Sequence, residues 1–259
     1  MSTKLYNNIV VGPLKSRRLG HSLGINLLPL RGKICTFDCI YCECGWNKDH
    51  LQNHEFVPYE KLHEVIRDDI ALKAKNKIQI DSITFSGNGE PTLHPDFPAI
   101  VDLVLSLRDL YYPNAKVSVL SNATTLGKEK VFNALKRVDN PIMKLDGGDE
   151  SFVKIINGAK EDYTIAEVIK NLHKFNGDFI MQTMFLKGRL ETGEYIDSTL
   201  EVLVKKWIDI VLELKPREVM VYTIDRDTPD PNLEKVTISE MKDITDPLKK
   251  AGINVQISG

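Results

Sequence analysis

Short runs of β-forming residues alternate with runs of helical periodicity along most of the chain. Six segments read as strands, at residues 22–28, 82–85, 116–120, 141–145, 179–184 and 218–222. Between them, apolar residues recur at three- and four-residue spacing, which is typical of helices with one buried face. Strands that alternate with helices predict a parallel sheet joined by right-handed crossovers. The pattern leaves open whether this α/β sheet is doubly wound or forms a complete or partial barrel.

Local signals refine the ends of this arrangement. Two predicted helices begin with a capping box, Thr164 with Glu167 and Thr237 with Glu240. We expect a last helix and a final strand in residues 227–259, and residues 1–20 to form an extension ahead of the first strand. Residues 1–259 together are predicted to be one domain, which suits a chain of this length.

Composition limits the classes of function. The hydrophobic fraction is 42% and the charged fraction 27%, which are ordinary values for a soluble globular protein. The formal net charge of −2 argues against non-specific nucleic-acid binding through bulk charge. No stretch approaches the roughly 20 apolar residues that span a bilayer, and residues 1–8 lack the apolar core of a signal peptide. We therefore expect a cytoplasmic protein with no membrane partner.

All four cysteines, Cys35, Cys39, Cys42 and Cys44, lie within ten residues. This crowding favours metal or cluster ligation over a disulfide framework, which would join distant segments. Thiolates suit iron–sulfur clusters and zinc, and three of them can hold three corners of a cubane cluster while one iron stays open. The alternative is a structural zinc site that uses all four thiols. It is less favoured because zinc sites usually pair two separate cysteine hairpins, and Cys44 follows Cys42 too closely for easy tetrahedral closure.

Polar and glycine-rich segments follow the first four predicted strands, where parallel sheets bind ligands. They are the cysteine loop and residues 86–92, 121–125 and 146–149. In the second of these segments, Gly87 and Gly89 allow the backbone to approach a ligand closely. Glu90 adds a carboxylate that can bind a cationic ammonium group.

The first three cysteines, with Tyr41 directly before the last of them, resemble the signature of radical S-adenosylmethionine (SAM) enzymes. The segment around Gly87, Asn88, Gly89 and Glu90 resembles the glycine–glycine–glutamate motif of the same family, with Asn88 in place of a glycine. The resemblance implies a partial six-stranded βα barrel. It also implies a [4Fe-4S] cluster on the three cysteines, with SAM bound to its open iron. Tyr41 would contact the adenine, and the glycine–glutamate segment would bind the amino group. One electron would cleave SAM to a 5′-deoxyadenosyl radical, which abstracts hydrogen from a substrate.

Two further strand ends hold candidate cofactor-binding residues. Ser121 and Asn122 can hydrogen-bond a ribose hydroxyl or the SAM carboxylate, or they form a polar turn that caps the next helix. Lys144 and Asp146 lie two residues apart and therefore point the same way from a strand. They either contact a bound amino acid or form a structural ion pair with each other.

The basic segment at residues 12–20 and the segment at residues 222–229 resemble parts of a radical SAM group that includes the wyosine tRNA synthetases. That resemblance places Arg17, Arg18 and the Asp225–Arg226 pair at the substrate mouth, with solvated arginines as the alternative. The wyosine synthetases carry a second set of cysteines that is missing here, so one cluster is predicted. Lys15 and Lys33, with the two N-terminal arginines, favour an anionic partner near the mouth.

Several substrate classes fit these predictions. They are a tRNA base or other nucleic acid, a peptide or protein, and a small metabolite. The protein reading includes an activase of a glycyl radical enzyme. An electron donor such as flavodoxin or ferredoxin would be a partner. The opposing class is a non-catalytic zinc-binding interaction module.

Overall fold

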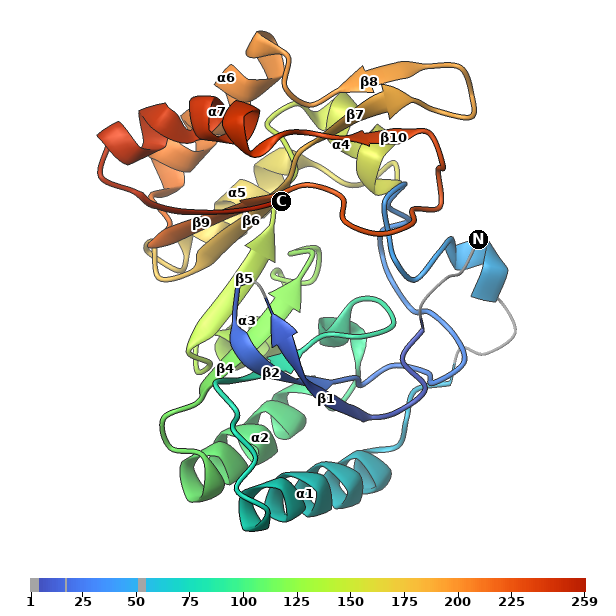
Figure 1. The fold of residues 1–259 in the computed structure, drawn as a ribbon, viewed down its shortest axis with the longest axis vertical. Helices are drawn as coiled ribbons and strands as arrows, with labels where there is room; N and C mark the ends of the chain where they lie inside the picture. The colour runs from blue at the N-terminus through green and yellow to red at the C-terminus, as the bar shows by residue number, and fades with distance from the viewer. Residues whose placement is uncertain (1–4, 17, 51–54) are drawn as a thin grey trace.

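The computed structural model describes residues 5–16, 18–50 and 55–259. Its main feature is an eight-stranded sheet in the order β1-β2-β3-β4-β5-β6-β9-β11, in which every neighbouring pair is parallel except β1 and β2. The strands are β1 (Val10–Ser16), β2 (Gly20–Ile25), β3 (Ser82–Phe85), β4 (Lys116–Ser121), β5 (Asn140–Lys144), β6 (Ile180–Met184), β9 (Glu218–Tyr222) and β11 (Asn254–Ser258). The sheet curls into a half-barrel, as Figure 1 shows.

Helices cover the outer face of the curl. They are α1 (Tyr59–Lys75), α2 (Phe97–Tyr111), α3 (Glu129–Leu135), α4 (Glu150–Asn157), α5 (Ile165–His173), α6 (Glu201–Leu214) and α7 (Ile238–Lys250). Short 3₁₀ turns lie at Asn47–His50 and Pro91–Leu93. In Figure 1 the blue loop that follows β2 runs along the open side of the half-barrel. No helix among the described residues is both long enough and apolar enough to cross a membrane.

Successive side chains along a strand point alternately to the helices and to the inner face of the half-barrel. On β5, for example, Met143 faces the main core under the helices, whereas Ile142 belongs to a small cluster on the inner face with Ile180 and Met220. Two residues further along, the inner face of the same strand presents Lys144, which lines a cavity. The closed end of the half-barrel is thus filled by apolar side chains, and the carboxyl ends of the strands carry the polar groups.

The predicted fold class is confirmed, and the partial barrel is the correct choice among the alternatives. The six predicted strands are β2, β3, β4, β5, β6 and β9, and they lie side by side in this order. Thr237 and Glu240 form the full predicted capping box, and the Thr164 side chain caps α5.

Two boundaries differ from the prediction by more than one residue. The first strand was expected at residues 22–28, but β2 spans Gly20–Ile25. It ends there because the Asn26 side chain accepts the Leu28 N–H at 3.2 Å and turns the chain. Residues 10–16, which were expected in an extension ahead of the sheet, form the antiparallel edge strand β1.

A second, three-stranded sheet was not predicted. It has the order β10-β7-β8 and consists of β7 (Leu186–Arg189), β8 (Tyr195–Asp197) and β10 (Leu233–Lys235). Leu186 and Ile196 from this sheet pack with Phe37 and Ile40 of the cysteine loop in one buried cluster. The small sheet therefore supports the outer side of that loop.

Candidate functional site

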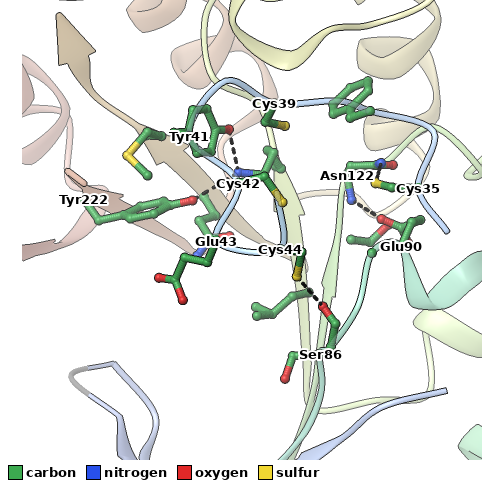
Figure 2. A pocket seen from close by; sticks show the side chains of 18 of the residues that line it. Cys35, Cys39, Tyr41, Cys42, Glu43, Cys44, Ser86, Glu90, Asn122 and Tyr222 are labelled. Carbon is green, nitrogen blue, oxygen red and sulfur yellow. Dashed lines mark hydrogen bonds between the residues drawn. The ribbon is translucent and has the colours of Figure 1, made fainter. Parts of the chain in front are cut away.

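A cavity of about 280 Å³ lies at the carboxyl ends of β3, β4, β5, β6 and β9. Its walls are formed by Tyr6, Arg18, Cys35, Phe37, Cys39, Tyr41, Cys42, Glu43, Cys44, Ser86, Gly87, Gly89, Glu90, Leu120, Ser121, Asn122, Lys144, Gln182, Met184 and Tyr222. In Figure 2, Cys35, Glu90 and Asn122 lie on one side and Tyr41 and Tyr222 on the other, with Cys42 and Cys44 between them. The structure thus brings most of the predicted site residues to one cavity.

Backbone hydrogen bonds hold the cysteine loop from two sides. On one side, Ile34 N donates to Asn88 O at 3.1 Å and Glu90 N donates to Ile34 O at 2.9 Å, which joins the loop to the glycine–glutamate segment. On the other side, Asp38 N donates to the Asn157 carbonyl at the end of α4, at 2.8 Å. All four thiols of the loop consequently line the same cavity.

Gly89 is required where these two segments meet. Its φ is +124°, and a Cβ at this position would lie 2.0 Å from the Ile34 carbonyl oxygen.

We expect Gly89→Ala to lower the free energy of unfolding by at least about 2 kcal/mol, because a backbone clash adds to the unfavourable dihedral angle. The matched control is Gly193→Ala, at φ +88° with nothing within 4 Å of the added Cβ, which should cost only about 1 kcal/mol. Denaturant unfolding measures both, and equal losses would contradict the role assigned to Gly89.

The thiols are mostly buried, and this determines their protonation. Burial raises the pKa of Cys35 and raises that of Cys39 to about 11. The neighbouring Cys44 thiol lowers the pKa of Cys42 to about 6, and Cys42 together with burial raises that of Cys44. Thiol ligands must lose their protons to bind iron, so cluster binding is coupled to proton release from this loop.

The donor set is compatible with a cluster. Within the described parts of the chain, no three His, Cys, Asp or Glu side chains are grouped so that they could hold one metal ion. The first three thiols surround a shared cavity, as ligands at separate corners of a cubane must. The Cys44 thiol is 3.6 Å from the Gly87 carbonyl oxygen and donates to it. The geometry therefore favours three cluster ligands and a fourth thiol directed at the glycine segment.

Glu90 is only 2% exposed and is held by three donors. Its carboxylate accepts the Asn122 N–H at 2.6 Å, the Thr92 hydroxyl at 2.5 Å and the Thr92 N–H at 3.2 Å. Burial raises the pKa of Glu90, although these hydrogen bonds oppose the shift. A cation bound beside it would compensate the buried charge. The Glu90 carboxylate thus forms a buried acidic part of the cavity wall.

Asn88 differs from its neighbours in the same segment. Its side chain is fully buried and is directed to the Tyr6 backbone, at 2.8 and 2.9 Å, and to the Pro29 carbonyl, at 2.7 Å. It does not line the cavity. The asparagine that replaces a glycine of the motif therefore supports the segment from behind and fastens the N-terminal part of the chain.

Ser121 and Asn122 both line the cavity at the end of β4. The Ser121 hydroxyl accepts the Ala123 N–H at 3.1 Å, as a polar turn would. The Asn122 amide donates to the Thr36 hydroxyl at 2.8 Å and lies 3.6 Å from the Cys35 sulfur. Asn122 thus joins the end of β4 to the cysteine loop.

Lys144 and Asp146 point the same way, as their spacing predicted, and lie 3.5 Å apart. The Lys144 ammonium donates to the Tyr41 and Tyr222 hydroxyls, both at 3.0 Å. The Tyr41 hydroxyl in turn donates to Asp146. Burial alone would lower the pKa of Lys144, but Asp146 and Tyr222 raise it overall. The result is a buried ion pair, of which Lys144 lines the cavity and Asp146 lies behind it.

Asn157 is a site residue that sequence reasoning missed. Its side-chain amide donates to Asp146 at 2.8 Å and to the Tyr41 hydroxyl at 2.9 Å, and it lies 3.4 Å from the Cys39 sulfur. It ends α4, a helix that the apolar pattern did not single out. Tyr222 was not singled out as a site residue either. It ends a predicted strand, and parallel sheets bind ligands at the carboxyl ends of their strands, so its position could have identified it.

The basic residues expected at the substrate mouth lie in different places in the structure. The Arg18 guanidinium lies 4.6 Å from the centre of the Tyr222 ring and lines the cavity. Arg226 pairs with Glu43 beside an adjoining cavity of about 60 Å³. Lys15 is exposed on β1, and Arg17 lies outside the described residues.

Lys33 was expected near the mouth, and this prediction is wrong. Its side chain is 1% exposed and lies beneath the cysteine loop. The ammonium donates to the Gly45 carbonyl at 2.7 Å and to Asp38 at 3.3 Å. Burial alone would lower the pKa of Lys33, but the Cys42 and Cys35 thiols and Asp38 raise it overall. Sequence pattern could not distinguish this lysine from solvated ones.

Residues 30–203 match the family model of the radical SAM superfamily, and the chain belongs to this superfamily. The family implies a [4Fe-4S] cluster and SAM as cofactors. Radical SAM enzymes also need a reductant.

Two relatives are similar to this chain in sequence. The chain is 33% identical to a UPF0026 protein of Methanocaldococcus jannaschii over 201 residues, which cover 75% of this chain and 59% of the relative. It is 28% identical over 244 residues to a protein named GTPase Obg of Brachyspira hyodysenteriae, covering 93% of this chain and 33% of that protein. The chain thus spans only part of the length of both relatives.

Solved structures share the fold at low sequence identity. A radical SAM methyltransferase from Sphaerobacter thermophilus gives a TM-score of 0.67 at 12% identity, covering 92% of this chain and 65% of that one. Archaeal TYW1, from the wyosine group, gives a TM-score of 0.51 at 12% identity, covering 88% of this chain and 71% of that one. Both likenesses show the fold alone. The superfamily is thus confirmed, whereas the predicted place beside the wyosine group has only this distant structural likeness.

Proposed function

We propose that Cys35, Cys39 and Cys42 hold one [4Fe-4S] cluster and that SAM binds its fourth iron. The observation that carries this proposal is that the three thiols and the Glu90 carboxylate line one cavity at the strand ends. When bound, the cluster supplies one electron that cleaves SAM to the 5′-deoxyadenosyl radical. The protein holds the cofactors in place and limits the access of water.

The remaining cavity residues are assigned by their positions. Glu90, with the backbone of Gly87 and Gly89, would bind the SAM amino group, and Asn88 supports this segment from behind. Tyr41 would contact the adenine. Ser121 and Asn122 would face the ribose or the carboxylate, and Lys144 would attract the carboxylate while Asp146 holds Lys144 in place.

The substrate is proposed to be a tRNA or other nucleic-acid base, or a peptide or protein. Support comes from the open side of the half-barrel and from Arg18 and Arg226 beside the two cavities. A glycyl-radical-enzyme activase belongs to the second of these classes, and a member of the wyosine group to the first. A flavodoxin or ferredoxin is proposed as the electron donor. We also propose that residues 1–259 act as a single radical SAM domain.

Anaerobic reconstitution tests the proposed cofactors. The protein is expected to be brown, to contain iron and sulfide in the proportion of one [4Fe-4S] cluster per chain, and to bleach on reduction with dithionite. With SAM and reductant it should form 5′-deoxyadenosine. A colourless protein with one zinc per chain under the same conditions would contradict the proposal and favour the interaction module.

The two substrate classes can be separated with the same product assay. Total RNA and a peptide digest are added separately to reduced enzyme with SAM, and 5′-deoxyadenosine is compared with the substrate-free rate. We expect stimulation by one of the two pools and none by the other, because hydrogen abstraction draws the cleavage reaction forward. If neither pool stimulates cleavage, both macromolecular classes are rejected in favour of a small metabolite.

A further inference from the structure

Lys33 carries a positive charge that is enclosed by the cysteine loop. The residue precedes Cys35 by two positions, and its ammonium reaches across to the Gly45 carbonyl, beyond the last of the cysteines, at 2.7 Å. A second acceptor, Asp38, lies between the first two cysteines and binds the same ammonium at 3.3 Å. The side chain is only 1% exposed. The loop that bears the three thiols therefore folds over this ammonium group.

Both contacts of Lys33, one of them with a carboxylate, suit a charged ammonium group. A backbone carbonyl and a carboxylate only accept hydrogen bonds, so both contacts require the Lys33 nitrogen to donate. Asp38 is its one carboxylate partner among the described residues, and the Asp38 side chain is 31% exposed. Water therefore screens the negative charge more than the positive one, and a net positive potential remains beneath the loop.

We propose that Lys33 is a positioning residue that raises the reduction potential of the cluster held by Cys35, Cys39 and Cys42. The inference rests on the proposed function. Reduction adds one electron from the flavodoxin- or ferredoxin-type donor to the cluster, and no bond forms or breaks. A fixed positive charge beneath the loop stabilises the more negative, reduced state relative to the oxidised one.

Two amide groups act in the same direction. The Asn157 amide lies 3.4 Å from the Cys39 sulfur, and the Asn122 amide lies 3.6 Å from the Cys35 sulfur. Hydrogen bonds to cluster sulfurs contribute to the potential of iron–sulfur proteins. These groups are neutral dipoles, whereas Lys33 carries a full charge.

The test uses two substitutions that change charge in opposite directions. Lys33→Gln removes the positive charge, and Asp38→Asn removes the negative one. The asparagine retains an oxygen for both hydrogen bonds, because Lys33 and the Asn47 N–H bind the same oxygen of Asp38. The full chain is reconstituted anaerobically, and the midpoint potential is measured by redox titration followed by electron paramagnetic resonance.

We expect Lys33→Gln to reduce the ratio of reduced to oxidised cluster at least tenfold at a fixed potential. For one electron, this corresponds to a shift of the midpoint potential by about 59 mV to more negative values. Asp38→Asn should shift the potential the other way by a smaller amount. A merely structural role would give unchanged potentials or shifts of the same sign, and either result overturns the proposal. If Lys33→Gln assembles no cluster, the Asp38→Asn variant alone decides. The proposal is then overturned if the midpoint potential of that variant does not shift to a more positive value. An unmodified chain without a cluster would reject the proposed function instead.

Discussion

Replacing Cys39 with alanine is expected to abolish SAM cleavage, whereas replacing Cys44 should leave most of it. Cys39 is one of three proposed ligands, and removal of one corner ligand should prevent stable assembly of the cluster. Cys44 instead directs its thiol to the Gly87 carbonyl. Iron content, visible absorption and 5′-deoxyadenosine formation are measured for both variants after anaerobic reconstitution.

Cys35→Ala and Cys42→Ala serve as further members of this series and should behave as Cys39→Ala does. The Cys44→Ala variant is the matched control, because it removes a thiol from the same loop and the same cavity. Equal losses in Cys39→Ala and Cys44→Ala would contradict the assigned ligand set. Retention of cleavage without Cys39 would contradict it more strongly.

The second large effect is expected at Glu90. Glu90→Gln should weaken SAM binding about ten- to hundredfold, because a hydrogen bond to a charged group contributes roughly 1.5–3 kcal/mol. Asn122 and Thr92 bind different oxygens of Glu90, so glutamine can keep its oxygen for the Asn122 N–H and turn its NH2 group to the Thr92 hydroxyl, which can accept, while the Thr92 N–H loses its acceptor. Burial already disfavours the charge by raising the pKa of Glu90. The fold should therefore tolerate the change. SAM affinity is measured by equilibrium dialysis on the anaerobically reconstituted protein.

Glu43→Gln provides the control for this prediction. Its carboxylate also lines the cavity but pairs with Arg226, and its side chain is 46% exposed. We expect SAM affinity to stay within about twofold of the unmodified protein, since surface ion pairs contribute little. Comparable weakening in both variants would show that overall cavity charge, rather than Glu90, attracts the ligand.

Much of the fold was accessible from the sequence because most of the main strands are largely buried and alternate with amphipathic segments. The strands β2, β3, β4, β5, β6 and β9 and their parallel pairing followed from this pattern. The edge strand β1 and the sheet of β7, β8 and β10 were not found. β7, β8 and β10 are only three or four residues long, too short for a readable pattern, and β1 is an edge strand with no fully buried residue.

The site was predictable where chemistry is concentrated in short motifs. The cysteine spacing and the glycine–glutamate segment pointed to the same cavity, and the spacing of Lys144 and Asp146 placed both on one face. The residues that were wrongly placed or missed owe their positions to contacts between distant segments. Lys33 is buried because the cysteine loop folds over it, and Asn157 enters the site from the end of α4. Such contacts leave no periodic signal in the sequence.

The central claim is that one iron of a cluster on Cys35, Cys39 and Cys42 is left for SAM. Electron paramagnetic resonance of the reduced, reconstituted protein with and without SAM tests it most directly. The account predicts that SAM changes the signal of the reduced cluster, and that ¹⁵N in the SAM amino group adds a coupling to it. A signal that stays the same when saturating SAM is added would contradict the account.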